Sequence, residues 1–538
     1  MKRLVCTLLL SIISLAAFAQ DDEYSKYLEA QRIKMQKQMD DFIMDRQKQY
    51  KDFVDQQNAE FAEFVAKRWE LFNEFAKERL ALTEPKIEKA PVADEAKDVE
   101  IVSTEIQFAQ DEELPSVTHA MAMAFDDEYE NNYEQKSRIS DKGTEDLPAK
   151  EYKKETKKKK VDNSKDVILN FYGREVTLHV DPKLRIKSVD VEEENVADYF
   201  SKIAKCRQET AELWGDMEKV VNDFGLNEWG YYCLVRVLSE QLFENINDRV
   251  LFCFYMLRNE GGYKTRLARG KDSGNLTLLI AIDNSKQVYS YTFFRFNDDE
   301  EGTKKVKYYT VYGGGKAKEP IYSYDFCPQD VSKKEMALDF TKILNMGECD
   351  VERTVNLTKD KQIVLPYNQA HMAYLNDVPM TVFPIYFVSP LSIEAQQRLQ
   401  KEFDQMRTEY TPTKFIAMLL HFVQTGFEYK TDEEQFGYEK YFYPEEVLGY
   451  PYCDCEDRSA LFAWLVQKYT NAKVIGLQYE GHVATAVCFG DDANINGDGF
   501  MYGGKKYYIC DPTYINAGIG MAMPQFKGKT PKVIKLKQ

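Results

Sequence analysis

The sequence predicts an α+β protein in which a long N-terminal helix and a charged linker precede two α+β domains. Three observations lead to this fold class. An eleven-residue repeat runs through residues 39–82, a proline-containing segment of mixed charge covers 83–165, and helical and strand patterns alternate from 166 onward. A chain of 538 residues is long enough for two or three domains with separate cores.

The first residues have the pattern of a secretory signal peptide. Lys2 and Arg3 precede an apolar run over 4–15, and Ala17-Phe18-Ala19 matches an A-x-A cleavage site. We therefore expect residues 1–19 to be removed by cleavage after Ala19, and the mature protein to be secreted or periplasmic. No later run approaches the about 18 apolar residues that a membrane span needs, so no membrane span is predicted.

Residues 20–82 are predicted to form a long amphipathic helix. Phe42, Phe53, Phe64 and Phe75 are spaced eleven residues apart, and neither Pro nor Gly interrupts residues 21–84. Eleven residues over three turns place the repeated positions on one face and predict a slightly right-handed supercoil with any partner helix. Both self-association through residues 21–82 and folding back on the chain remain open, and the bulk of the aromatic side chains favours folding back.

Residues 83–165 are predicted to be a disordered charged linker, because they combine four prolines with mixed charge and little periodicity. The chain carries 71 basic and 88 acidic residues, for a net charge of −17. This balance argues against nucleic acid as a partner, since nucleic acid binding needs a basic surface. The lysine run at 157–160 is interpreted as a solvated part of the linker.

The remaining chain divides into three predicted segments. Residues 166–330 form an α+β domain that opens with a hairpin around Gly173-Arg174, continues with helices over 196–258, and ends with strands near 276–282, 289–296 and 306–312. Residues 331–390 are a connecting β-rich segment. Residues 391–538 form a second α+β domain, helical over 391–425.

Cys455 is the strongest candidate for a catalytic residue. It precedes the helical run 456–466, and a thiol in the first turn of a helix feels the unpaired amides and the positive end of the dipole, which favour thiolate. His482 begins a predicted strand and Asp511 ends another. A Cys–His–Asp set predicts nucleophilic catalysis, in which His482 takes the thiol proton to form a thiolate–imidazolium pair and Asp511 orients the imidazole. The Cys455 amide is a candidate oxyanion donor, and Tyr450 and Tyr452 are candidates for a second.

Two alternatives concern the neighbouring thiol. Cys453 is either a spectator or forms a strained C-x-C disulfide with Cys455 that inactivates the site. A zinc site built from Cys453, Cys455, His482 and Cys510 is the weaker interpretation, because C-x-C is tighter than the usual ligand spacing. We predict no metal and no cofactor.

Three motifs resemble those of the transglutaminase-like superfamily, namely Cys455-Glu456-Asp457 opening a helix, Gly481-His482-Val483 opening a strand, and residues 508–513 (Tyr-Ile-Cys-Asp-Pro-Thr) closing one. The resemblance covers roughly residues 391–538 and departs from the family at Cys453, where glycine is expected. It implies a papain-like α+β core and acyl transfer through a thioester, with Cys455, His482 and Asp511 as nucleophile, base and orienting acid.

A weaker resemblance lies within the chain. Residues 247–252 open a predicted helix as residues 456–461 do, and Gly274-Asn275 precedes a strand as Gly481-His482 does. In this alignment Ile246, Asn275 and Tyr312 take the triad positions, and none of them supports the chemistry. Residues 166–330 are therefore a candidate degenerate copy of the catalytic domain; chance similarity of unrelated elements is the alternative.

These observations lead to two functional hypotheses. The first is an extracytoplasmic cysteine peptidase or acyltransferase that acts on amide bonds of proteins or peptides, with hydrolysis preferred over amine transfer. The second is a non-catalytic interaction protein that uses a transglutaminase-like fold and the N-terminal helix for binding.

Overall fold

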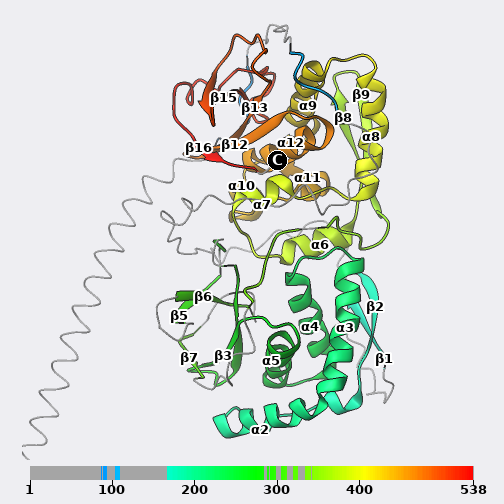
Figure 1. Cartoon of the computed structure of the whole chain (residues 1–538), viewed down its shortest axis with the longest axis vertical. Coiled ribbons are helices and arrows are strands. Elements are labelled where there is room, and N and C mark those ends of the chain that lie inside the picture. Colours follow the sequence, from blue (N-terminus) through cyan, green and yellow to red (C-terminus); the bar gives the residue numbers. More distant parts are fainter. Residues whose placement is uncertain are drawn as a thin grey trace, which may run out of the picture. The chain divides into compact units, whose positions relative to one another are not determined.

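The computed structural model describes residues 87, 89–93, 103–109, 166–283, 287–289, 291–297, 305–311, 315, 319–324, 334–340 and 342–536. The predicted signal peptide 1–19 and repeat helix 20–82 lie outside the described residues. The chain from Pro85 to Gln538 forms one compact unit. Helices and antiparallel sheets alternate through it, which confirms the mixed α and β composition of the predicted fold (Figure 1).

The first lobe, residues 166–350, opens with the predicted hairpin. Strands β1 (Asp166–Phe171) and β2 (Arg174–His179) pair antiparallel through a turn at Tyr172 and Gly173. Both turn residues have positive φ, 49° and 88°, as a two-residue turn requires to match the twist of its strands. Four helices follow, α2 (Glu193–Ile203), α3 (Arg207–Asp223), α4 (Trp229–Leu242) and α5 (Ile246–Tyr255).

The sheet of the first lobe has five antiparallel strands in the order β5-β6-β4-β3-β7. They are β3 (Thr265–Gly270), β4 (Leu276–Ala281), β5 (Phe293–Asn297), β6 (Lys305–Thr310) and β7 (Ile321–Ser323). Helix α5 packs against β4 and β3 and buries the apolar face that the sequence pattern predicts.

The second lobe, residues 351–536, repeats this plan. It begins with an antiparallel hairpin, β8 (Val351–Thr358) and β9 (Lys361–Tyr367), which packs against α9 and α8. Its helices are α6 (Gln369–Asp377), α7 (Phe383–Val388), α8 (Ile393–Arg407), α9 (Pro412–Gly426), α10 (Asp432–Phe436), α11 (Pro444–Gly449) and α12 (Cys455–Tyr469). The short strands β10 (Glu428–Tyr429) and β11 (Tyr452–Cys453) pair in parallel between them.

The sheet of the second lobe has the order β14-β15-β13-β12-β16, which is the order of the first sheet element for element. Its strands are β12 (Lys473–Tyr479), β13 (His482–Cys488), β14 (Gly499–Tyr502), β15 (Lys505–Cys510) and β16 (Lys532–Ile534). Helix α12 packs on β13 and β12 as α5 packs on β4 and β3. Figure 1 shows the two sheets in green and in orange to red.

The pairing register of the two sheets also agrees. Thr485, the fourth residue of β13, faces Cys510, the last residue of β15. Leu279, the fourth residue of β4, faces Thr310, the last residue of β6. Corresponding residues of the two lobes can therefore be assigned from the sheets without relying on sequence similarity.

The residues of the first lobe that correspond to His482 and Asp511 in this register differ by one position from those that sequence similarity predicts. Sequence similarity placed Asn275 and Tyr312 at the second and third triad positions, whereas the sheets place Leu276 and Val311 there. The alignment failed because residues 271–275 join β3 to β4, while only residues 480–481 join β12 to β13. Tyr312 itself lies outside the described residues. Two apolar side chains at these positions cannot move a proton.

Part of the segment predicted as a disordered linker is ordered. Residues 91–93 and 107–109 hydrogen-bond to the second lobe, where Val92 pairs in parallel with Ile515 and Phe108 pairs antiparallel with Thr470. The linker was predicted from the overall polar composition of residues 83–165, which does not reveal the short apolar groups within them. Phe108, for example, packs edge-on against Phe415 with ring centroids 5.4 Å apart. Within the part of the chain that is described, no helix is long and apolar enough to cross a membrane.

A buried hydrogen bond joins the two lobes. The Tyr374 hydroxyl on α6 donates to Asn227 Oδ1, 2.6 Å away, and Asn227 Nδ2 donates to the Leu338 carbonyl. We expect Tyr374→Phe to lower the free energy of unfolding by about 1 kcal/mol, because the ring remains packed while one hydrogen bond is lost. Urea unfolding measures the change. Tyr322→Phe is the control, since Tyr322 is 59% exposed; equal effects of the two substitutions would contradict the prediction.

Candidate active site

Helix α12 places Cys455 at its first residue, as the sequence predicts. Asp454 is the N-cap, and the backbone amide of Asp454 donates to the Asp457 carboxylate at 3.1 Å. Phe442 N–H donates to the other oxygen of the same carboxylate. Asp457 thereby ties the helix start to the preceding loop, and Cys455 is held there with only 2% of its surface exposed.

His482 and Asp511 come together through the sheet. His482 is the first residue of β13 and Asp511 directly follows β15, and these two strands are neighbours. His482 Nε2 lies 2.9 Å from Asp511 Oδ2, and both residues are 2% exposed. The other carboxylate oxygen accepts from Thr513 N–H at 2.9 Å. An ionised carboxylate only accepts, so Nε2 carries the proton and the lone pair is on Nδ1.

Two aromatic rings lie parallel to the imidazole. The Phe526 ring lies 4.9 Å from the His482 ring at 15°, and the Tyr479 ring lies 6.4 Å away at 17°. Burial, together with the nearby Asp511 carboxylate, raises the pKa of Tyr479 to about 12. The imidazole is thus held by one hydrogen bond along its edge and by the Phe526 ring stacked on one face, and Phe526 in turn packs on Tyr479 at 4.9 Å.

Two buried polar side chains connect α12 and α9 to the strands of the site. Ser459 lies one turn beyond Cys455, and its hydroxyl donates to the carbonyl of Val483, the residue after His482, at 3.0 Å. Gln424 on α9 donates through Nε2 to the carbonyl oxygens of Asp511 and Ala517, each at 3.0 Å. These bonds set the position of the helix start relative to the histidine and the aspartate.

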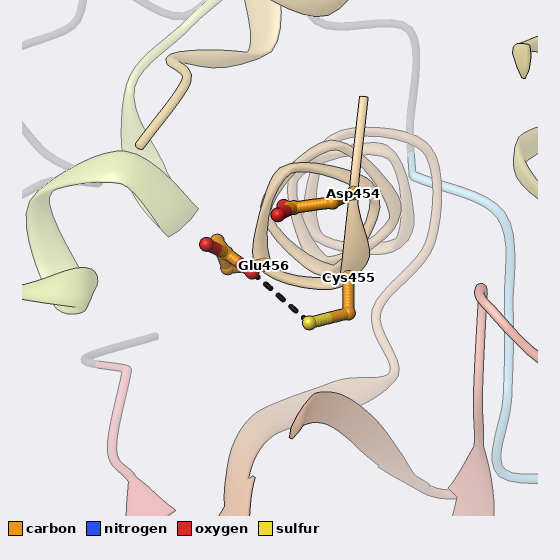
Figure 2. Close-up of side chains that lie close together, drawn as sticks. All are labelled: Asp454, Cys455 and Glu456. Atoms are coloured by element: carbon orange, nitrogen blue, oxygen red, sulfur yellow. Dashed lines mark hydrogen bonds between the residues drawn. The ribbon is translucent and has the colours of Figure 1, made fainter. Parts of the chain in front are cut away.

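The Cys455 thiol points to a neighbouring carboxylate. Its Sγ donates to Glu456 Oε2 at 3.0 Å, as the dashed line in Figure 2 marks. His482 Nδ1 is buried and has no hydrogen-bond partner. The predicted thiolate–imidazolium pair is therefore not formed in this structure. Catalytic hydrogen bonds are often long or absent without substrate, and they tighten in the complex.

Several carboxylates gather around the start of α12. The ligand atoms of Asp454, Cys455 and Glu456 lie within 4.8 Å of one another, and so do those of Asp432, Asp454 and Asp457. Glu439 joins Asp432 and Glu456 in a third such group. These groups have the chemistry of cation ligands. An acidic cluster, however, can also lower its charge by binding protons.

Proton binding is the response that the cluster favours at Asp457. Burial, and after it the carboxylates of Asp454 and Glu456, raises the pKa of Asp457 well above its usual range. Two buried cations lie in the same region. Lys440 Nζ lies 2.6 Å from Glu446 Oε1, and the Lys440 amide donates to Asp432. The fully buried Arg458 donates to two backbone carbonyls, one of them Phe427 O at 2.7 Å.

Cys453 is held apart from its neighbour. It lies in β11, beside β10, and its Sγ donates to the Glu428 carbonyl at 3.8 Å. Burial raises the pKa of the Cys453 thiol to about 11. Cys453 and Cys455 are both free thiols here, as are the other described cysteines. No three of the predicted zinc ligands have ligand atoms within 4.8 Å of one another.

Tyr450, one of the predicted oxyanion donors, packs in the core of the lobe. Its ring stacks on Phe442 at 4.5 Å, and burial raises the pKa of Tyr450 to about 12. The Cys455 amide stays a predicted oxyanion donor, because it belongs to the first turn of α12. The sequence analysis missed Glu456, Ser459, Gln424 and Phe526. Only Glu456 had a signal, its position beside the cysteine.

Comparison with protein-family models, with characterised proteins and with solved structures found no match. The geometry of the site is therefore the basis for a functional assignment.

The carboxylate at Glu456 should suppress formation of the Cys455 thiolate. Glu456→Gln keeps the size of the side chain and removes its negative charge. We expect iodoacetamide to alkylate Cys455 roughly 3- to 10-fold faster at pH 7, because about 1 kcal/mol of charge repulsion is relieved. Mass spectrometry of the labelled peptide measures the rate. Glu433→Gln, on an exposed position of the same lobe, should leave the rate unchanged; an unaltered rate in Glu456→Gln would contradict the assignment.

The raised pKa of Asp457 predicts a dependence of stability on pH. Its raised pKa means that the folded state holds this proton more tightly than the unfolded state. The stabilisation is complete below about pH 4 and is lost as pH rises through the folded pKa, at up to about 1.4 kcal/mol per pH unit. Urea unfolding from pH 5 to 9 should show a flatter profile for Asp457→Asn, although its stability at pH 5 is lower. The exposed Asp491→Asn control should keep the wild-type slope.

Proposed function

We propose that the protein is an extracytoplasmic cysteine enzyme that acts on amide bonds of proteins or peptides through a thioester. The observation that carries the proposal is the buried His482–Asp511 hydrogen bond, which leaves the Nδ1 lone pair as a base in the same lobe as the helix-start thiol. Resemblance to the transglutaminase-like superfamily supports the same assignment of Cys455, His482 and Asp511, and with it a papain-like core.

The proposed reaction has two stages. His482 Nδ1 takes the proton from Cys455 Sγ, and the thiolate attacks the amide carbonyl carbon. The C–N bond then breaks, the leaving nitrogen receives the proton from Nδ1, and a thioester remains. In the second stage Nδ1 deprotonates a water or amine that attacks the thioester. The C–S bond breaks and Sγ regains its proton. Asp511 stabilises the imidazolium in both stages.

Hydrolysis is preferred over amine transfer because water is the abundant second substrate. The stacked Phe526 and Tyr479 rings orient the imidazole but do not select between the two acceptors. The substrate is a protein or peptide, since the family that the motifs resemble acts on amide groups.

We also propose that the first lobe is a degenerate copy of the second. The equal strand order and the equal pairing register support this. A buried aspartate supports it further, because Asp248 in α5 accepts from the Ser188 amide at 2.8 Å, as Asp457 in α12 accepts from the Phe442 amide. Ile246, Leu276 and Val311 take the triad positions, so this lobe would serve in packing or binding.

One observation favours the non-catalytic alternative. The Cys455 thiol donates to Glu456 while His482 Nδ1 has no hydrogen-bond partner, so the pair on which catalysis depends is not made in this structure. A fold that already lacks the triad in its first lobe could use both lobes for binding.

Chemical labelling and turnover together separate the two functions. The full-length protein is incubated with a peptide mixture, with and without a fluorescent primary amine, and products are identified by mass spectrometry. We expect cleavage or deamidation of peptides, and loss of at least about 10³-fold in rate for Cys455→Ala and His482→Ala. Asp511→Asn should lower the rate by about 10²- to 10⁴-fold. Cys453→Ser is the matched thiol control and should remain active.

Amine incorporation in place of hydrolysis would make the enzyme a transferase. If Cys455 is labelled selectively at mildly acidic pH in the wild type and not in His482→Ala, the result supports an enzyme, whether hydrolase or transferase. Equally slow labelling of all thiols under reducing conditions, with no peptide product, would establish the binding protein instead.

A further inference from the structure

A short segment from far upstream lies beside the candidate active site. We call residues 89–93, with Ile87, the strap. The Ala93 amide donates to the Ile515 carbonyl at 2.9 Å, and the Ile515 amide donates to the Pro91 carbonyl at 2.9 Å. These two bonds form a parallel bridge between Val92 and Ile515, four residues after Asp511. The strap thus binds through its backbone, as a peptide does when it adds to a strand.

Val92, which forms the bridge, and Ala93 after it differ in exposure as successive residues of an extended strand do. Val92 is 65% exposed, whereas Ala93 is 5% exposed. The pocket around Ala93 is apolar and is formed by Tyr514, Ala517, Met523 and Phe526. The buried methyl group of Ala93 among these apolar side chains indicates a subsite for a small apolar residue.

The pocket and the catalytic histidine share one ring. Phe526 belongs to the cluster that receives Ala93, and it stacks on the imidazole of His482 at 4.9 Å. Tyr479 packs against the same cluster and also lies parallel to the imidazole. The binding edge at Ile515 follows Asp511 through Thr513, whose amide orients the Asp511 carboxylate. A peptide bound here contacts the groups that hold the base in place.

We propose that the Ile515 backbone and the Ala93 pocket form a peptide-binding subsite, which takes an extended segment with a small apolar side chain and is filled in cis by the strap. The proposal rests on the proposed function, because it assigns this peptide chemistry to the substrate of the same site. A tethered segment acts at an effective concentration in the millimolar range, so the strap competes with substrate in every molecule.

A matched pair of substitutions tests the occupancy. Ala93→Asp places a carboxylate in the apolar pocket and should release the strap, whereas Val92→Asp places the same group in solvent. The probe is a fluorescein-labelled peptide, acetyl-Lys-Ala-Pro-Val-Ala-Asp-amide, with the sequence of residues 89–94. Fluorescence anisotropy with the full-length protein should show at least about tenfold tighter binding to Ala93→Asp than to wild type or Val92→Asp.

A second probe, in which aspartate replaces the alanine that follows valine, should not bind any of the proteins. A folded Ala93→Asp protein that binds the original probe no better than wild type would overturn the proposal and leave the strap as a structural element. Thermal unfolding reports whether the variant is folded. If it is not, Ala93→Pro removes the N–H that donates to Ile515 without adding a charge, and hydrogen exchange at the Ile515 amide then reports release of the strap.

The outcome is independent of catalysis. The same binding experiment in Cys455→Ser should give the same tenfold difference, even if the protein proves to have no enzymatic activity. If the protein is an enzyme, Ala93→Asp should also raise kcat/KM for peptides, with Val92→Asp as the control. An active enzyme whose kcat/KM is unchanged by release of the strap would contradict the assignment of the subsite to the substrate.

Discussion

The packing of α12 on β13 is the constraint on which the candidate site depends. Cys455 belongs to the helix and His482 to the strand, so their separation is set by whatever fixes one element against the other. The Ser459 hydroxyl provides that contact, with its bond to the Val483 carbonyl one turn from the thiol and one residue from the imidazole. Misplacement by an ångström is enough to lower a rate a hundredfold, which makes this bond a positioning element of the proposed reaction.

The second determinant is the charge around the helix start. A helix N-terminus favours anions, yet the first turn of α12 already holds Asp454, Glu456 and Asp457. The amide groups that would stabilise a thiolate are therefore partly committed to carboxylates, and burial, together with the neighbouring Asp454 and Glu456, raises the pKa of Asp457. The hydrogen bond that the Cys455 thiol donates to Glu456 is one that a neutral thiol makes and a thiolate cannot.

Comparison of the two lobes separates architecture from chemistry. Asp248 and Asp457 both accept backbone amides at a helix start, so this aspartate has the same structural role in both lobes. At the positions that correspond to Cys455, His482 and Asp511, the first lobe has Ile246, Leu276 and Val311. The strap likewise contacts only the second lobe among the described contacts, at the strand end that carries Asp511.

Local periodicity and turn residues in the sequence predicted the start of α12 and the end of β15 to within one residue, at residue 456 and at Asp511, and the start of β13 at His482. The sequence also predicted the first hairpin. Tertiary structure alone decided the partner of the thiol, the stacking of Phe526 on the imidazole and the docking of residues 89–93 beside Ile515. These contacts join residues distant in the chain, and no local pattern encodes which distant side chain fills a given space. The internal alignment slipped by one residue for a similar reason, since connection lengths vary between lobes while sheet register does not.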